Sequence, residues 1–231
     1  MACTSVSKSF RNAAIASALL VSGCSDRTQI SRMSATIEVV ITDQMLRASA
    51  SLYDGSAPYI VGASDHLTVG IHDQTFELTY AESNEVFFGR PYYGTGALTQ
   101  PIAADEPVEM TLDRAEDQGS IMGTAPLALV LEAPATIASG SDLLITWSPS
   151  SSDPMKWYAR ALNQTASDEG PIDVDVGTMT FPHDVIATLS SPGSTLEVEL
   201  QRLRSADAEG GFASGSVTVR RFDRAEILVT R

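Results

Sequence analysis

Thr36-Ile37-Glu38-Val39-Val40-Ile41-Thr42 is the stretch that decides the fold, because its β-branched residues predict a β-strand. Residues 46–52 follow with a regular alternation of apolar and polar side chains, which predicts a second, half-buried strand. Asp, Gly, Ser and Pro at residues 54–58 predict a turn. The folded part of the chain therefore starts near residue 35 as a series of short strands.

The same pattern of short predicted strands separated by turns continues to residue 132. Residues 67–71 and 76–80 predict a hairpin around a turn at 72–74, and further strands are expected at 85–89, 108–112 and 127–131. Only residues 103–115 come near a helical period, and Pro107 lies inside them. We therefore expect residues 35–132 to form one antiparallel β-sandwich.

A second set of strands follows Pro134, which lies among small residues after a completed strand and predicts a domain boundary. This set is expected at residues 143–147, 157–161, 178–182, 196–200, 217–219 and 227–229, with a long polar turn at 148–154. Residues 133–231 are thus predicted to form a second sandwich. A single larger sandwich stays open as the alternative.

At Leu143-Leu144-Ile145-Thr146-Trp147-Ser148-Pro149 the chain resembles a strand of fibronectin type III and other immunoglobulin-like modules, in which a core tryptophan precedes a polar turn that contains proline. It departs from the pattern at residues 196–200, which lack the tyrosine of the usual corner bond. The resemblance implies an all-β fold class: two immunoglobulin-like antiparallel β-sandwiches after a signal peptide and a tether.

The N-terminus has the parts of an export signal. Lys8 and Arg11 precede an apolar run at residues 13–20, and the run closes on Val21-Ser22-Gly23-Cys24. These four residues resemble the lipobox of bacterial lipoproteins, which implies cleavage after residue 23 and attachment of palmitate-type lipid to Cys24. Residues 24–34 are polar and without period, so we expect a tether. Because Ser25 rather than an aspartate follows Cys24, the resemblance implies the outer membrane, on its periplasmic or cell-surface face.

Charge and cysteine usage limit the partners. The net charge of −14 repels phosphate backbones and anionic lipid headgroups, so no nucleic-acid partner is expected. No second apolar run approaches the roughly 18 residues of a membrane span, so the membrane contact is expected through lipid alone. Cys3 lies in the signal peptide, which leaves Cys24 without a disulfide partner.

Residues that could carry chemistry are few. The three histidines each stand beside an aspartate but are too far apart to share a metal within one strand. Four carboxylates at Asp168, Glu169, Asp173 and Asp175 could offer oxygens to calcium, although they lack a calcium-loop frame and fit a solvated face better. No nucleophile motif, metal site, catalytic residue or cofactor is predicted.

The predicted function is that of a non-catalytic binding or structural module, whose partner would be an envelope or surface protein or a glycan. Tyr93 and Tyr158 are the candidate ligand contacts, because exposed aromatic side chains can form a binding platform. The alternative is a carbohydrate-binding accessory or a hydrolase of the envelope, with the site at Tyr92, Tyr93 and the acidic residues near Asp173.

Overall fold

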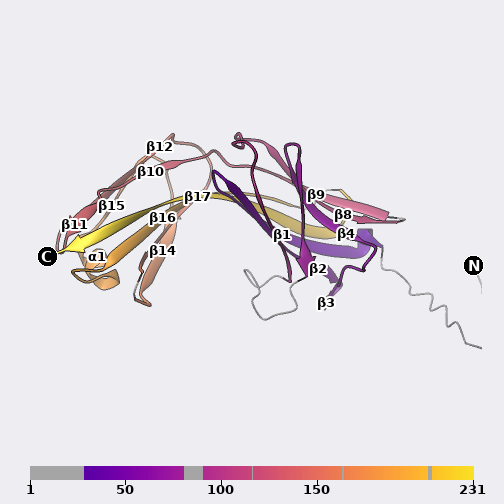
Figure 1. The fold of residues 1–231 in the computed structure, drawn as a ribbon, viewed down its shortest axis with the longest axis horizontal. Helices are drawn as coiled ribbons and strands as arrows, with labels where there is room; N and C mark the ends of the chain where they lie inside the picture. The colour runs from indigo at the N-terminus through magenta and orange to yellow at the C-terminus, as the bar shows by residue number, and fades with distance from the viewer. Residues whose placement is uncertain (1–28, 81–90, 116, 163, 208–209) are drawn as a thin grey trace, which may run out of the picture.

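The structure is a computed structural model and describes residues 29–80, 91–115, 117–162, 164–207 and 210–231. It is all-β and elongated, with two β-sandwiches arranged end to end (Figure 1). One large sheet runs through both sandwiches, and each sandwich is completed by a smaller sheet of its own. The expected all-β fold class is confirmed.

The large sheet has ten strands in the order β14-β13-β16-β17-β1-β2-β7-β6, and β11 and β3 pair with β17 and β2 beside this path. Its strands are β1 (Met33–Ile41), β2 (Met45–Asp54), β3 (Ala57–Pro58), β6 (Thr79–Tyr80), β7 (Tyr92–Ala97), β11 (Thr136–Ala138), β13 (Met155–Ala161), β14 (Ser167–Ile172), β16 (Thr195–Asp207) and β17 (Ser214–Thr230).

Two smaller sheets cover this large sheet. A four-stranded sheet, in the order β5-β4-β8-β9, completes the first sandwich, and a three-stranded sheet, β10-β12-β15, completes the second. Their strands are β4 (His66–Ile71), β5 (Gln74–Glu77), β8 (Pro107–Arg114), β9 (Asp117–Thr124), β10 (Val130–Glu132), β12 (Leu143–Ser148) and β15 (Thr178–Phe181).

β17 joins the two sandwiches. Its first half pairs in parallel with β1, its end pairs in parallel with β11, and β16 pairs with it in antiparallel fashion over almost its whole length. Figure 1 shows β17 as the long yellow strand that crosses from one sandwich to the other. The strands expected at 217–219 and 227–229 are therefore one continuous strand. The other pairs among the named strands of the described residues are antiparallel.

Gly215 allows β1 and β17 to lie side by side. Its φ is +154°, and a Cβ at this position would lie 2.0 Å from the carbonyl oxygen of Ala35. Backbone atoms cannot move aside as the end of a long side chain can, so only glycine fits this approach. The parallel pairing thus depends on a residue that has no side chain.

Each sandwich has its own apolar core. The first contains Ile37 and Val39 of β1 with Val217 and Val219 of β17, and the second contains Trp147, Ile227 and Val229 among others. Each fully buried side chain of this size stabilises the fold by about 1.5–3 kcal/mol. The division into domains of residues 35–132 and 133–231 stays a prediction. The first core, however, contains side chains from both ranges.

The N-terminal tether is shorter than predicted. Within the expected range of 24–34, Ile30 and Met33 are fully buried in the first core, and residues Ile30–Arg32 form a 3₁₀ turn before β1. The backbone N–H of Ile30 donates to the carboxylate of Asp117 over 2.8 Å. Ile30 and Met33, three residues apart, attach this segment to the core. The prediction missed them because most of the other residues of the segment are polar.

The predicted hairpin and short strands of the first sandwich agree with the structure in part. The hairpin is confirmed, with β4 and β5 joined by His72 and Asp73, and His72 adopts a positive φ of 56°. Its second strand ends at Glu77 rather than residue 80, because residues 79–80 form β6 in the large sheet. The strand expected at 127–131 occupies only Val130–Glu132, and the one expected at 85–89 lies outside the described residues. Strands β7 and β9 were not expected, because glycines interrupt their alternation.

One short helix also departs from the predicted all-strand pattern. α1 (His183–Leu189) follows Pro182, carries Asp184 in its first turn and buries Ile186 and Leu189 in the second core. A proline before the first turn and an acidic residue within it both favour a helix start. With only two buried positions, the helix was too short to show a period in the sequence.

Candidate functional site at the joint between the sandwiches

The predicted lipidation site, Cys24, lies outside the described residues, so its role stays a prediction. In the part of the chain that the structure describes, no helix has the length and apolar character needed to span a membrane.

The two candidate tyrosines do not form one surface. Both Tyr93 on β7 and Tyr158 on β13 are half-buried, and they belong to different sandwiches. Five strand steps separate β7 from β13 in the large sheet, which corresponds to at least about 24 Å. Their neighbour Tyr92 belongs to the core: its hydroxyl accepts from Val61 N–H at 2.6 Å, and burial raises the pKa of this phenol.

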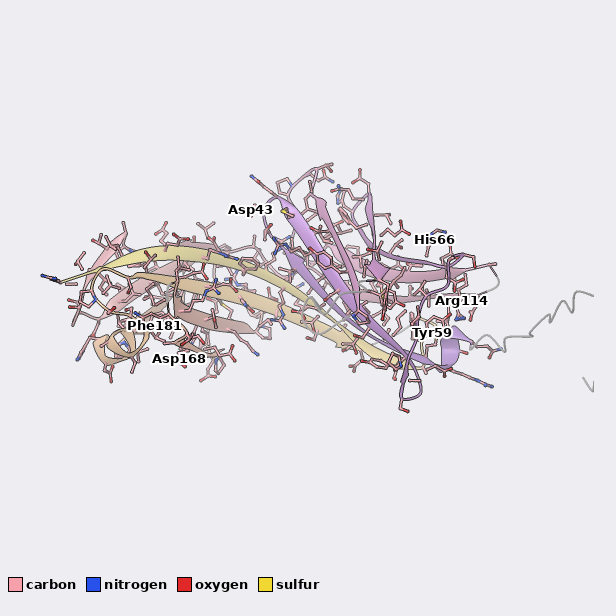
Figure 2. The ribbon with its side chains drawn as sticks, turned by 60° about the horizontal axis from the view of Figure 1, so that its bottom comes forward. Asp43, Tyr59, His66, Arg114, Asp168 and Phe181 are labelled. Carbon is pink, nitrogen blue, oxygen red and sulfur yellow. The ribbon has the colours of Figure 1, made fainter. Side chains whose placement is uncertain are left out.

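The acidic stretch at 168–175 is divided between two places. Asp168 and Glu169 lie exposed on the edge strand β14, where Figure 2 labels Asp168, whereas Asp175 turns towards Arg202 in the interior. Asp175 accepts hydrogen bonds from the Trp147 indole at 2.6 Å and from the Ser151 N–H at 2.8 Å. Among the described residues no group of three or more His, Cys, Asp and Glu side chains is placed to hold a metal ion.

The histidines lie apart, and each has a carboxylate beside it from another segment. The Nδ1 atoms of His66, His72 and His183 lie 3.5, 2.9 and 3.2 Å from Glu77, Glu106 and Asp142. The backbone N–H of His183, followed by its ring, lowers the pKa of the Asp142 carboxyl. These exposed pairs fasten loops and turns locally.

The most unusual cluster lies where the two cores end along β16 and β17. Inward-facing positions of these strands are apolar within each sandwich, but between the sandwiches they are Arg202, Arg204, Arg221 and Asp223. These four residues, together with residues 125–131 of the connecting segment, are called the joint below. Arg202 and Arg221 stand directly opposite each other in the strand register.

Arg202 is fully buried and well partnered. Its Nη2 lies 2.8 Å from the carboxylate of Asp175 and also donates to the Pro149 carbonyl, while Nη1 donates to the Ala128 carbonyl at 3.0 Å. Burial would raise the pKa of Asp175, but the N–H of Ser151, the Trp147 indole and Arg202 outweigh it and hold the pKa below 3.8. This arginine therefore joins the turn after β12, the loop before β15 and the connecting segment.

Arg204 has the same kind of role one step further along β16. Its Nε donates to Asp153 at 2.6 Å, and Nη1 contacts both Asp105 and the Ala125 carbonyl. Asp153 in turn accepts from the N–H of Leu127 at 3.0 Å. Burial of Asp153 opposes ionisation, but this N–H and Arg204 hold its pKa below the ordinary value. Because Asp105 belongs to the first sandwich and Asp153 to the second, Arg204 links the two.

Arg221 differs from both neighbours. Its exposed fraction is 7%, and it donates from Nη2 to the Ile102 carbonyl at 2.5 Å, with the Ala103 carbonyl at 3.4 Å. Its buried Nε has no hydrogen-bond partner within the described residues, which is also true of the Nε of Arg202, so the difference lies in the missing aspartate contact. Burial lowers the pKa of this guanidinium, and Asp43 only partly opposes that effect. Figure 2 shows Asp43 at the end of β1 and β2 that faces the second sandwich.

A cavity of about 320 Å³ adjoins Arg221. Its walls come from the turn after β1, the loop before β8, the connecting segment and β17: Ile41, Thr42, Asp43, Pro101, Ile102, Ala128, Leu129, Arg221 and Phe222. The cavity lies where the edge of β17 opposite β16 has no strand beside it, since the pairing of β17 with β1 ends at Arg221 and its pairing with β11 starts at Leu228.

Sequence reasoning did not find this joint. A signal was present, because the alternation of Leu196, Val198 and Leu200 continues to Arg202 and Arg204 and places both arginines on the inward face. Charged residues at core positions of a strand are rare unless they are paired, so their presence marks a specialised site.

A scan against family models and a search of curated protein sequences both find no match. Among solved structures, one match is a segment of two fibronectin type III domains from chicken tenascin, with 10% identity and a TM-score of 0.25. It covers 82% of this chain and 97% of that chain. A TM-score this low supports no argument. The strand pairings define the class: an all-β protein of two β-sandwiches that share one sheet.

Proposed function

We propose that this protein is a lipid-anchored module of the cell envelope that acts by binding or by holding structure, without catalysis. In this proposal, lipid on Cys24 fixes the chain to the outer membrane, and the two sandwiches present surfaces at a fixed spacing. The observation that carries the module role is the joint, in which continuous strands and arginines connect the sandwiches.

The joint supports a rigid module for a physical reason. A flexible linker between domains lets each domain rotate, whereas β16 and β17 continue through the joint with unbroken strand pairing. The connecting segment is fastened to these strands at two further points, where Leu127 N–H donates to Asp153 and Leu131 N–H donates to Asp223 at 2.8 Å. The spacing between the sandwiches is therefore built into the sheet.

The N-terminus gives the proposed module an orientation. From Cys24 to the first buried residue, Ile30, the chain can span at most about 20 Å. If lipid is attached at Cys24, the first sandwich stays beside the membrane and the second projects away from it. This arrangement suits a protein that reaches a partner at a set distance from the lipid surface.

Anchoring is tested by metabolic labelling with radioactive palmitate and by fractionation of the membranes. We expect label and outer-membrane sedimentation for the wild-type chain, and loss of both in Cys24→Ala. A Cys3→Ala variant is the matched control and should keep both. Label that persists in Cys24→Ala would reject the anchor.

The rigid spacing is tested separately by electron–electron distance measurements. Spin labels at Thr95→Cys in the first sandwich and Thr180→Cys in the second, both exposed positions, would be placed in a Cys3→Ser/Cys24→Ser chain. We expect a single narrow distance distribution. A broad distribution would show that the sandwiches move independently and would contradict the module role proposed here.

A further inference from the structure

The cavity beside Arg221 has the chemistry of a ligand site rather than of a packing gap. It brings one buried cation together with apolar walls from Ile41, Pro101, Ile102, Leu129 and Phe222. A volume of about 320 Å³ lies at the lower end of the range for small-molecule sites. The cavity also lies between the two sandwiches, and interfaces between domains are a frequent position for binding sites.

Arg221 lacks the close aspartate contact that the other two arginines of the joint make. Arg202 contacts Asp175 at 2.8 Å, and Arg204 contacts Asp153 at 2.6 Å. Arg221 is nearly as buried as Arg202, yet within the described residues its recorded hydrogen bonds go to carbonyl oxygens alone, and Asp43 opposes only in part the effect of burial on its pKa. A buried cation whose charge is only partly balanced favours an anion brought by a ligand.

Two features narrow the class of anion. A guanidinium is planar and can offer a pair of donors to a carboxylate, and the hydrogen bonds of Arg221 to the Ile102 and Ala103 carbonyls both come from Nη2. Asp43 on the cavity wall and the net charge of −14 repel a doubly charged group more strongly than a singly charged one. The apolar walls require the rest of the ligand to be apolar.

We propose that the cavity binds a small organic carboxylate, with its carboxylate on Arg221 and its apolar body against Leu129 and Phe222. This inference rests on the proposed function only in treating the protein as a binding module, and it names the ligand class. Lipid anchoring and rigid spacing have their own readouts, so failure to bind carboxylates would leave those results unaffected.

Isothermal titration of the purified full chain tests the proposal with acetate, hexanoate, phenylacetate and indole-3-acetate. Phenylacetamide and phenyl phosphate are the matched neutral and doubly charged probes. We expect saturable binding of at least one of the three carboxylates with an apolar body, weaker binding of acetate, and at least roughly tenfold weaker binding of phenylacetamide than of phenylacetate. Absence of saturable binding by every carboxylate up to roughly 10 mM would overturn the proposal, as would equal binding of the amide or tighter binding of the phosphate ester.

Variants locate the bound carboxylate. Arg221→Met, which keeps an apolar stem, and Leu129→Trp, which fills the cavity, should both abolish binding. Arg160→Met is the control, because Arg160 is an exposed arginine of β13 that lies outside this cavity. Asp43→Asn removes a repelling charge and should tighten binding about twofold. Binding that persists in folded Leu129→Trp, or that weakens in Asp43→Asn, would place the ligand elsewhere and overturn the proposal even if Arg221→Met fails to fold.

Discussion

Along the same two strands, the inward-facing residues of the sandwich cores and those of the joint differ completely in chemistry. In the cores, Val219 and Ile227 of β17 are buried among apolar side chains, whereas Arg221 binds the carbonyl of Ile102 and Asp223 binds the N–H of Leu131. Strand pairing is unbroken across the change. The comparison teaches that backbone pairing keeps the sheet continuous. The inward-facing side chains determine whether a part of the sheet packs in an apolar core or binds the segments that connect the two sandwiches.

The largest effect is expected where the joint is most tightly partnered. Arg202→Ala would leave the buried Asp175 carboxylate without its cation and three carbonyl groups without their donor. We expect the free energy of unfolding to fall by about 3–5 kcal/mol, measured by urea denaturation.

Arg221→Ala sharpens this result. It breaks no recorded hydrogen bond or ion pair with an aspartate and removes only the charge interaction with Asp43, so its cost should be clearly smaller than that of Arg202→Ala. Equal losses for the two variants would mean that the partners of these arginines do not determine their contributions.

A core substitution tests whether the joint transmits stability between the sandwiches. Ile37→Ala creates a cavity in the first core and should cost about 2–5 kcal/mol. Both tryptophans of the chain, Trp147 and Trp157, pack in the second core, so their fluorescence reports the second sandwich. We expect the fluorescence midpoint in urea to fall together with the midpoint from circular dichroism.

Ile227→Ala in the second core provides the matched substitution, and it should shift both midpoints in the same way. If the fluorescence midpoint stays unchanged in Ile37→Ala, the sandwiches unfold separately and the shared strands do not couple them.

Acid should weaken the joint before it weakens the cores. Burial opposes ionisation of Asp175, but its hydrogen bonds prevail and its pKa in the folded protein lies below 3.8. The stability that ionised Asp175 contributes is therefore present above pH 3.8 and is lost as the pH falls through the folded pKa. Urea midpoints measured from about pH 5 to about pH 3 should fall less steeply in Asp175→Asn than in the wild type. A steeper fall in the variant would contradict this assignment.

The smallest effect is expected for a charged pair outside the joint. Arg224 lies on the outer face of β17, with its guanidinium nitrogens 3.5 Å from Glu197 and Glu199, and it is 46% exposed. Arg224→Ala should cost less than about 1 kcal/mol by urea denaturation. A loss as large as that of Arg202→Ala would remove the distinction between the two faces of the strand.

The sequence predicted the local parts of this fold well, because period and turn chemistry are local properties. Alternation at residues 46–52 and 157–161 corresponds to β2 and β13, although β2 is not half-buried as expected, because Ser49 and Ser51 on its polar face are buried as well. The parallel pairing of β1 with β17 could not be predicted in this way, since it joins residues far apart in the chain. Arg221 and Arg224 also hid the continuity of β17 by interrupting its apolar pattern.

The candidate site was predicted less well, and Asp175 shows why. Its sequence neighbours Asp168, Glu169 and Asp173 suggested a shared cation, but its actual partner is Arg202, which is distant in sequence. The role of a carboxylate depends on the charged group that faces it in space. Sequence spacing predicts this partner only when both residues lie in the same strand, helix or turn.

The pairing of Ser34 with Ser214 also dictates the order in which the protein can be completed during biosynthesis. β1 leaves the ribosome first among the strands, but its parallel neighbour β17 is made last. Neither sandwich can close its part of the large sheet until the C-terminal strand has been synthesised. A chain interrupted before residue 214 would therefore hold two unfinished sandwiches rather than one finished sandwich and one missing.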